Sequence, residues 1–147
     1  MRECLSYNDV LMVPQYSDIK SRSQVNLESR LGNKSFTLPI ISSPMDTITG
    51  TEMALAMEEA GGLGVVHRYC SIQEQIEMIS YENVRAAAIG VTGDFVNRVV
   101  ALYTAGIRIF CLDVAHGYHI HMQIAIERLK ETYGEEVHVM AGNVATR

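Results

Sequence analysis

Residues 38–67 read LPIISSPMDTITGTEMALAMEEAGGLGVVH, and this stretch decides the fold. Its apolar start, residues 38–42, contains β-branched side chains and predicts a strand. A helix follows over residues 51–60, because apolar side chains recur there on one face. Gly61 and Gly62 end that helix, and residues 63–67 predict a second strand.

The same alternation of apolar runs and helical patterns continues beyond this stretch. The next helix has a capping box, because Glu74 stands three residues after Ser71. Asp94 is the expected N-cap of the helix after it. In chain order, the further predicted elements are a helix at 71–80, a strand at 86–91, a helix at 94–104, a strand at 107–114, a helix at 118–133 and a strand at 137–143.

Strands that are apolar on both faces and alternate with helices are typical of a parallel sheet covered by helices. The predicted fold class is therefore α/β, and both a doubly wound sheet and a (β/α)₈ barrel of the TIM type fit this periodicity. Residues 1–37 are polar and interrupted, and they predict an extended, loop-rich N-terminal arm with little regular structure. We expect residues 38–147 to form a single domain.

The bulk composition argues against several classes of protein. With 147 residues, 48% of them hydrophobic, the chain can bury the core of one domain. Its net charge of −5 argues against a nucleic-acid-binding protein, which would carry a basic face. The sequence shows neither a transmembrane run nor a secretion signal. Cys4, Cys70 and Cys111 are too widely spaced for a zinc site and odd in number for a disulfide framework, so we expect a cytoplasmic protein.

Small, polar or ionisable residues follow the predicted strands, at the end where parallel α/β folds bind ligands. The Asp113 carboxylate could accept hydrogen bonds from a ribose or an amide there; capping a helix or pairing with a histidine is an equal alternative. Ser43 could hold a phosphate or simply end a strand. His116 and His119 could share one face of a helix, but neither the third ligand nor the supporting second shell that a metal site needs is visible. We therefore expect His116, His119 and His121 to be surface or loop histidines and assign no metal site.

No residue is assigned as a catalytic nucleophile. Cys111 lies within an apolar run and is expected to fill the core. Cys70 follows a strand, but its reactivity would need Arg68 or His67 to lower the pKa of the thiol. The glycine-rich segment 61–64 follows a helix and leads into a strand, which is the wrong order for a dinucleotide-binding fingerprint or a P-loop.

Several segments, taken together and in order, resemble the IMP dehydrogenase/GMP reductase family. They are the N-terminal LSYNDVLMVP at residues 5–14, SRS at 21–23, PIISSPMDTIT at 39–49, GGLGVVH at 61–67 and AGNV at 141–144. The resemblance covers nearly the whole chain. It implies a (β/α)₈ barrel, which would decide between the two architectures left open by the periodicity.

The resemblance also implies an activity and a site. Members of the family oxidise IMP to XMP with NAD, or reduce GMP to IMP with NADPH, through a thioimidate on a catalytic cysteine. By position, the residues implied at the purine nucleotide are Ser43, Met45 and Asn143. Those implied at the NAD or NADP cofactor are Asp113, Ala115, Gly117 and Arg68.

The branch of the family is not decided by the sequence. Residues 42–47 are closer to the dehydrogenases, whereas residues 111–118 are closer to the reductases. Residues 74–88 leave no room for the pair of regulatory CBS modules that dehydrogenases usually carry. Reductases and some shorter dehydrogenases share that absence.

The chain has about five of the eight βα units of a barrel, which takes roughly 250 residues. The resemblance puts the catalytic cysteine after the sixth strand, and none of the three cysteines matches it. We therefore expect the N-terminal part of a purine-nucleotide oxidoreductase, inactive alone, which forms a homo-oligomer or joins a complementing C-terminal chain. The alternative is a non-catalytic nucleotide-binding or assembly subunit. Neither nucleic acid nor a membrane is an expected partner.

Overall fold

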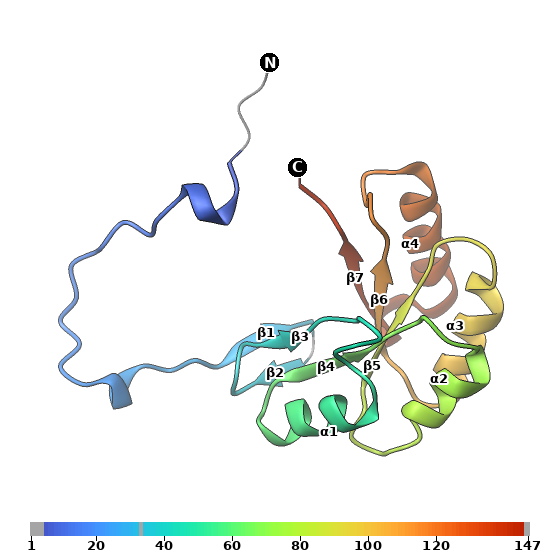
Figure 1. Ribbon diagram of the computed structural model, residues 1–147, viewed down its shortest axis with the longest axis horizontal. Helices are drawn as coiled ribbons and strands as arrows, with labels where there is room; N and C mark the ends of the chain where they lie inside the picture. Colours follow the sequence, from blue (N-terminus) through green and yellow to red (C-terminus); the bar gives the residue numbers. More distant parts are fainter. Residues whose placement is uncertain (1–4, 33, 146–147) are drawn as a thin grey trace.

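The computed structural model describes residues 5–32 and 34–145. Their main feature is a curled parallel half-barrel of five strands in the order β3-β4-β5-β6-β7 (Figure 1). The strands are β3 (Ile41–Ser42), β4 (Leu63–Val66), β5 (Ala86–Ile89), β6 (Ile109–Asp113) and β7 (His138–Gly142). The helices are α1 (Thr51–Glu59), α2 (Ile72–Met78), α3 (Phe95–Thr104) and α4 (Ile120–Tyr133), with the 3-10 turn η3 (Gly134–Glu136) after α4.

The predicted order of strands and helices is confirmed, and so is the α/β class. The capping box of α2 is present: the Ser71 hydroxyl accepts from the Glu74 amide at 3.2 Å, and the Glu74 carboxylate accepts from the Ser71 amide at 2.8 Å. Asp94 is the N-cap residue of α3, as expected, but its side chain makes no capping hydrogen bond. Asp94 precedes the helix, but its carboxylate binds the Arg98 side chain at 2.7 Å instead of a helix amide.

The sheet has apolar side chains on both faces, and these form two separate clusters. The larger cluster fills the space between the sheet and the helices, where Val66, Phe110 and Leu112 meet Leu102 and Leu129. The smaller cluster lies on the inner, concave face of the half-barrel and consists of Leu63, Val65, Ala86, Ala88 and Ile109. Burial on both faces is the reason that these strands read as continuous apolar runs.

The N-terminal region contains a hairpin that the sequence reading missed. β1 (Ser29–Leu31) and β2 (Lys34–Phe36) pair antiparallel, and Leu31 and Phe36 pack against the inner cluster. The expectation of little regular structure up to residue 37 is therefore wrong for residues 29–31 and 34–36. Tertiary packing explains why these strands form: each has only three residues, and Leu31 and Phe36 pack against the inner face of the half-barrel.

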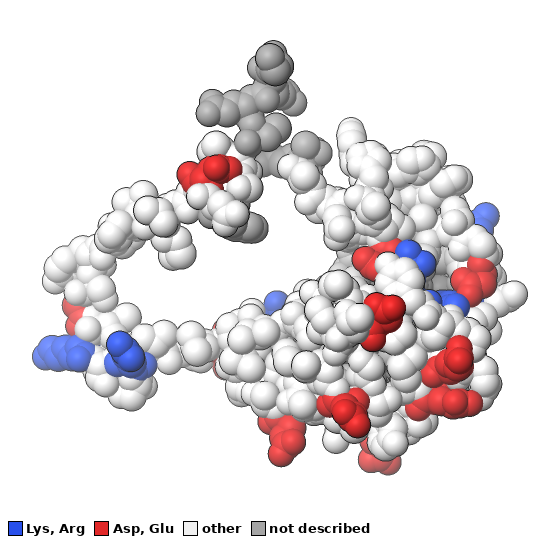
Figure 2. Space-filling model, viewed as in Figure 1, with Lys and Arg blue, Asp and Glu red and all other residues white. Residues whose placement is uncertain are grey.

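Residues 5–28 run in an extended arc outside the half-barrel, interrupted by two 3-10 turns, η1 (Tyr7–Asp9) and η2 (Arg22–Gln24) (Figure 1). Figure 2 shows basic side chains at the bend of the arc around η2 and acidic side chains over α1 and α2. The arc exposes apolar side chains, with Leu11 95% and Tyr16 94% accessible. Within the described residues, no helix combines the length and the apolar character needed to cross a membrane.

Candidate functional site at the carboxyl ends of the strands

Arg68 and Asp113 meet at the carboxyl end of the sheet. Arg68 follows β4 and Asp113 ends β6, so the arginine reaches across the end of β5 to make the contact. Its Nε donates to the Asp113 main-chain oxygen at 3.1 Å and lies 3.8 Å from Asp113 Oδ2. Gly90 lies under this crossing, since a Cβ built there would stand 3.5 Å from Arg68 Nη1.

Tyr69 completes this group. Its hydroxyl lies 3.5 Å from Asp113 Oδ2, at the outer limit of a hydrogen bond, and the Arg68 guanidinium carbon stands 5.0 Å from the centre of its ring. The helix after β6 is capped by His119 rather than by Asp113, and the carboxylate faces an arginine rather than a histidine. The two structural alternatives for Asp113 are therefore wrong, and its carboxylate is half-buried beside a cation.

The loop after β6 is fastened to the end of β7 by backbone hydrogen bonds. The Val114 amide donates to Gly142 at 2.9 Å, the Asn143 amide to Val114 at 2.7 Å, and the Gly117 amide to Asn143 at 2.7 Å. Gly117 is required by this close approach, because a Cβ there would stand 2.7 Å from the Asn143 main-chain oxygen. Ala115 lies exposed between these fixed points.

Ser43 and Met45 lie in the loop after β3, at the opposite edge of the sheet from Asn143. Both side chains are exposed, Met45 by 48%. Thr49 shapes this loop: its hydroxyl donates to the Ser43 main-chain oxygen at 2.6 Å, and its own carbonyl accepts from the His67 amide at 3.1 Å. The loop is thereby fastened to the end of β4.

The structure thus divides the residues assigned from the sequence into two groups. Arg68 and Asp113 touch directly, and the loop with Ala115 and Gly117 joins them to Asn143 through backbone hydrogen bonds. Ser43 and Met45 form the other group, and within the described residues no hydrogen bond links them to the first. β4 and β5 lie between the strand that precedes Ser43 and the strand that precedes Ala115.

Two buried polar residues behind the site were not predicted from the sequence. Gln75 in α2 is fully buried, and Arg98 in α3 is 6% exposed. Arg98 Nη1 donates to Gln75 Oε1 at 2.7 Å, and Gln75 Nε2 donates to the main-chain oxygens of His67 and Ala88, both at 2.9 Å. The spacing of Asp94 and Arg98, four residues apart on a helix, was the one signal of this network in the sequence.

The two described cysteines are poor nucleophiles. Burial raises the pKa of the Cys111 thiol to about 11, and the neighbouring Asp113 carboxylate adds to the effect. Burial also raises the pKa of Cys70, against the opposing influence of Arg98. Both thiols therefore stay protonated at neutral pH. Cys4 lies outside the described residues.

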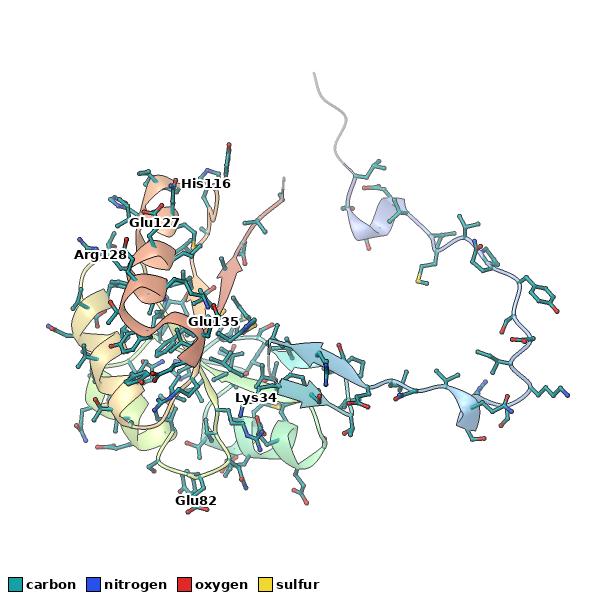
Figure 3. The ribbon with its side chains drawn as sticks, turned by 180° about the vertical axis from the view of Figure 1, so that it is seen from behind. Lys34, Glu82, His116, Glu127, Arg128 and Glu135 are labelled. Atoms are coloured by element: carbon teal, nitrogen blue, oxygen red, sulfur yellow. The ribbon has the colours of Figure 1, made fainter. Side chains whose placement is uncertain are left out.

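The histidines of the loop before α4 do not gather around a common point. The His119 side chain accepts from the His121 amide at 3.1 Å and so caps the helix, while the two rings stand 4.9 Å apart. Figure 3 shows His116 at the end of the body that carries the site, and Glu82, which precedes β5, at the opposite end. Among residues 5–32 and 34–145, no group of three His, Cys, Asp or Glu side chains is placed to hold a metal ion.

A parallel half-barrel with polar loops and close glycine contacts at the strand carboxyl ends is consistent with an incomplete βα barrel, the class of fold in which that end commonly binds ligands. The chain belongs to the IMP dehydrogenase/GMP reductase family, whose model, described as "IMP dehydrogenase / GMP reductase domain", matches residues 4–147. The resemblance inferred from the sequence motifs is therefore confirmed.

Relatives from both branches of the family match the chain. An inosine-5'-monophosphate dehydrogenase of Nitrosopumilus maritimus is 51% identical over 75 residues, covering 50% of this chain and 16% of the relative. A GMP reductase of Vibrio parahaemolyticus is 30% identical over 154 aligned residues, covering 97% of this chain and 44% of the relative. An inosine-5'-monophosphate dehydrogenase of Borreliella burgdorferi is 26% identical, covering 99% and 49%. The chain thus spans at most about half the length of these relatives.

Proposed function

We propose that this chain supplies the N-terminal half of the ring of a purine-nucleotide oxidoreductase that interconverts IMP and XMP, or GMP and IMP, with NAD or NADP. The observation that carries the proposal is the convergence of Arg68, Asp113 and Asn143 from three strands at one end of the sheet. Polar groups at that end are the usual ligand-binding groups of βα barrels. The family membership supplies the class of reaction.

The groups on the β6 side suit a dinucleotide. In the described residues, Asp113 Oδ2 has Arg68 and Tyr69 beside it, while Oδ1 has no hydrogen-bond partner and is left to accept from a ribose hydroxyl. The loop with Ala115 and Gly117 brings backbone close to the same place. When bound, the nicotinamide would take or give the hydride; this chain's residues would orient the ribose and hold the ring over the strand ends.

Ser43 and Met45, with Asn143 on the far edge, are proposed to bind the purine nucleotide. Their separation across the sheet fits a pocket whose remaining wall comes from strands beyond β7, as an eight-unit barrel would provide. The raised pKa values of Cys70 and Cys111 argue against either as the nucleophile. We therefore propose no turnover by this chain alone, and turnover only with the remaining strands, supplied by a complementing segment or chain.

The test is a calorimetric titration of the purified chain with IMP, GMP, NAD and NADP, with its mass followed by light scattering. Saturable binding supports the proposal if Asp113→Asn weakens the affinity for the dinucleotide about tenfold. Tenfold is the factor for one lost charge-assisted hydrogen bond. Glu127→Gln, an exposed change on the outer side of α4 (Figure 3), is the matched control.

The alternative is a non-catalytic nucleotide-binding or assembly subunit. It would be favoured if the chain binds a purine nucleotide and neither Asp113→Asn nor an added dinucleotide changes that binding. This alternative is favoured by the raised pKa values of Cys70 and Cys111, which leave the described residues without a good thiol nucleophile. No binding of any of the four compounds would remove the proposed function from this chain.

A further inference from the structure

The segment between β4 and α2 carries Arg68 and Tyr69, and it is held at both of its ends by buried side chains. At one end, Gln75 Nε2 donates to the His67 main-chain oxygen at 2.9 Å. At the other end, Arg98 Nη2 donates to the Cys70 main-chain oxygen at 2.8 Å. The residues that reach Asp113 lie between these two points.

These bonds replace pairing that the sheet no longer provides. The register of β4 with β5 ends at Val66 opposite Ala87, and the His67 carbonyl beyond it accepts from Gln75 instead. A buried carbonyl without a partner is costly. Gln75 satisfies His67 and Ala88 with the two hydrogens of one amide nitrogen, and this ties the ends of β4 and β5 to α2.

Arg98 is suited to this place by its shape. Its guanidinium makes three kinds of contact at once: Nη1 to Gln75 Oε1, Nη2 to the Cys70 carbonyl, and Nε with Nη2 to the Asp94 carboxylate at 3.0 and 2.7 Å. The carboxylate balances the charge that burial would otherwise penalise. A lysine ammonium carries the same charge but lacks the planar fork that spans these three acceptors.

We infer that Gln75 and Arg98 are positioning residues for the cofactor side of the site: they hold segment 67–70 where Arg68 can reach across β5 to Asp113. The inference rests on the proposed function for the identity of the ligand. Neither side chain contacts Asp113 itself. Both act through the backbone of a segment whose two outward side chains form the group at the end of β6.

The experiment compares Arg98→Lys with Arg85→Lys in the full chain. Arg85 is also paired with a carboxylate, Glu58, but lies before β5, at the other end of the sheet. The first readout is the rate of alkylation by iodoacetamide at Cys70 and at Cys111, separated by peptide mapping. Lysine keeps the positive charge near Cys70, so the electrostatic effect on the thiol changes little. A changed alkylation rate at Cys70 therefore indicates mainly that segment 67–70 has been released.

The expected result for Arg98→Lys is alkylation of Cys70 that is about tenfold faster, the factor for one lost charge-assisted hydrogen bond, with Cys111 unchanged. The affinity for NAD or NADP falls by a similar factor, while the affinity for IMP or GMP is unchanged. A general loss of structure would lower both affinities. Arg85→Lys changes neither readout. Cys70 and Cys111 rates that rise together, or that both stay constant, overturn the inference.

Asp94→Asn is the second variant, for the case that Arg98→Lys does not fold. Asp94 is exposed, and its loss frees the guanidinium of Arg98 from one of its three partners. A smaller rise in the alkylation rate that is confined to Cys70 supports the inference. If the rate at Cys70 does not rise selectively, the inference is overturned. The alkylation pattern decides the positioning role even if the wild-type chain binds no dinucleotide, a result that would count only against the proposed function.

Discussion

Glu58, near the end of α1, holds a carboxylate where little water reaches it. Its Oε2 lies 3.2 Å from Arg85 Nε, whereas Oε1 is buried and has no hydrogen-bond partner within the described residues. Burial raises the pKa of this carboxyl from its ordinary value of 4.5, although Arg85 and Lys34 act in the opposite direction. At this residue the cost of removing the carboxylate from water exceeds the attraction of its cations.

This imbalance predicts a pH dependence of stability. The pKa of Glu58 is higher in the folded chain than in the unfolded one. Its contribution to the free energy of unfolding is therefore fully present below pH 4.5 and is lost as the pH rises through the pKa of the folded chain. Glu58→Gln should therefore reduce the fall in unfolding free energy between pH 4.5 and pH 7, measured by urea denaturation at both. Glu131→Gln, at an exposed position of α4, should follow the wild type. An identical fall in Glu58→Gln and wild type would contradict the prediction.

At the scale of elements, the contact between α1 and β4 depends on the absence of one side chain. Gly64 lies in the middle of β4, fully buried, and a Cβ there would overlap the backbone of Ala54 in α1. The helix can therefore lie directly on the strand, and Ala54 has no exposed surface. The same helix ends at Glu59 with Ala60 as its C-cap, and Gly61 follows with a φ of 83°, a conformation that glycine adopts readily and other residues adopt only with strain.

Gly64→Ala should lower the free energy of unfolding by about 1–3 kcal/mol, the usual cost of overpacking a well-filled core. The reason is that α1 must move away from β4, or the strand must bend. Urea denaturation measures the change. Gly90→Ala is the matched control, because its new Cβ would make ordinary van der Waals contacts, with Arg68 Nη1 at 3.5 Å and the Thr92 main-chain oxygen at 3.9 Å. Equal free energies of unfolding for the two variants would contradict the prediction, because they would show that the α1–β4 contact can accommodate an added methyl group.

At the scale of the whole molecule, the half-barrel leaves apolar surface and strand edges uncovered. β3 and β7 each pair on one side only in the described sheet, and Ile41 of β3 is 49% exposed. Open edges and exposed apolar faces favour association with further strands. The hairpin of β1 and β2 covers part of the inner face but leaves these edges free.

The isolated chain should therefore self-associate, and Ile41→Lys should reduce that association by placing a charge on the uncovered face. Light scattering across a concentration series gives the mean mass of each variant. Ile124→Lys on the outer side of α4, where Ile124 is 38% exposed, introduces the same charge away from the half-barrel edge and should leave the mass unchanged. A wild-type chain that stays monomeric throughout would refute the prediction.

The sequence by itself determined the local structure and the family. The order of strands and helices, the Ser71 cap and the end of α1 just before Gly61 all follow from residue patterns within a few positions, because hydrophobic period and backbone conformation are local properties. The family motifs also lie within short segments, and the family they indicate is confirmed. The assignment of individual residues to nucleotide and cofactor remains a prediction.

Only the tertiary structure decided which distant residues meet. Asp113 follows Arg68 by 45 positions and Arg98 follows Gln75 by 23, and no local pattern brings either pair together. The paired strands β1 and β2 likewise pack Leu31 and Phe36 on the inner face of a sheet formed by later residues. Such contacts depend on how the parallel strands curl and align their carboxyl ends, which is a property of the assembled sheet and not of any one segment.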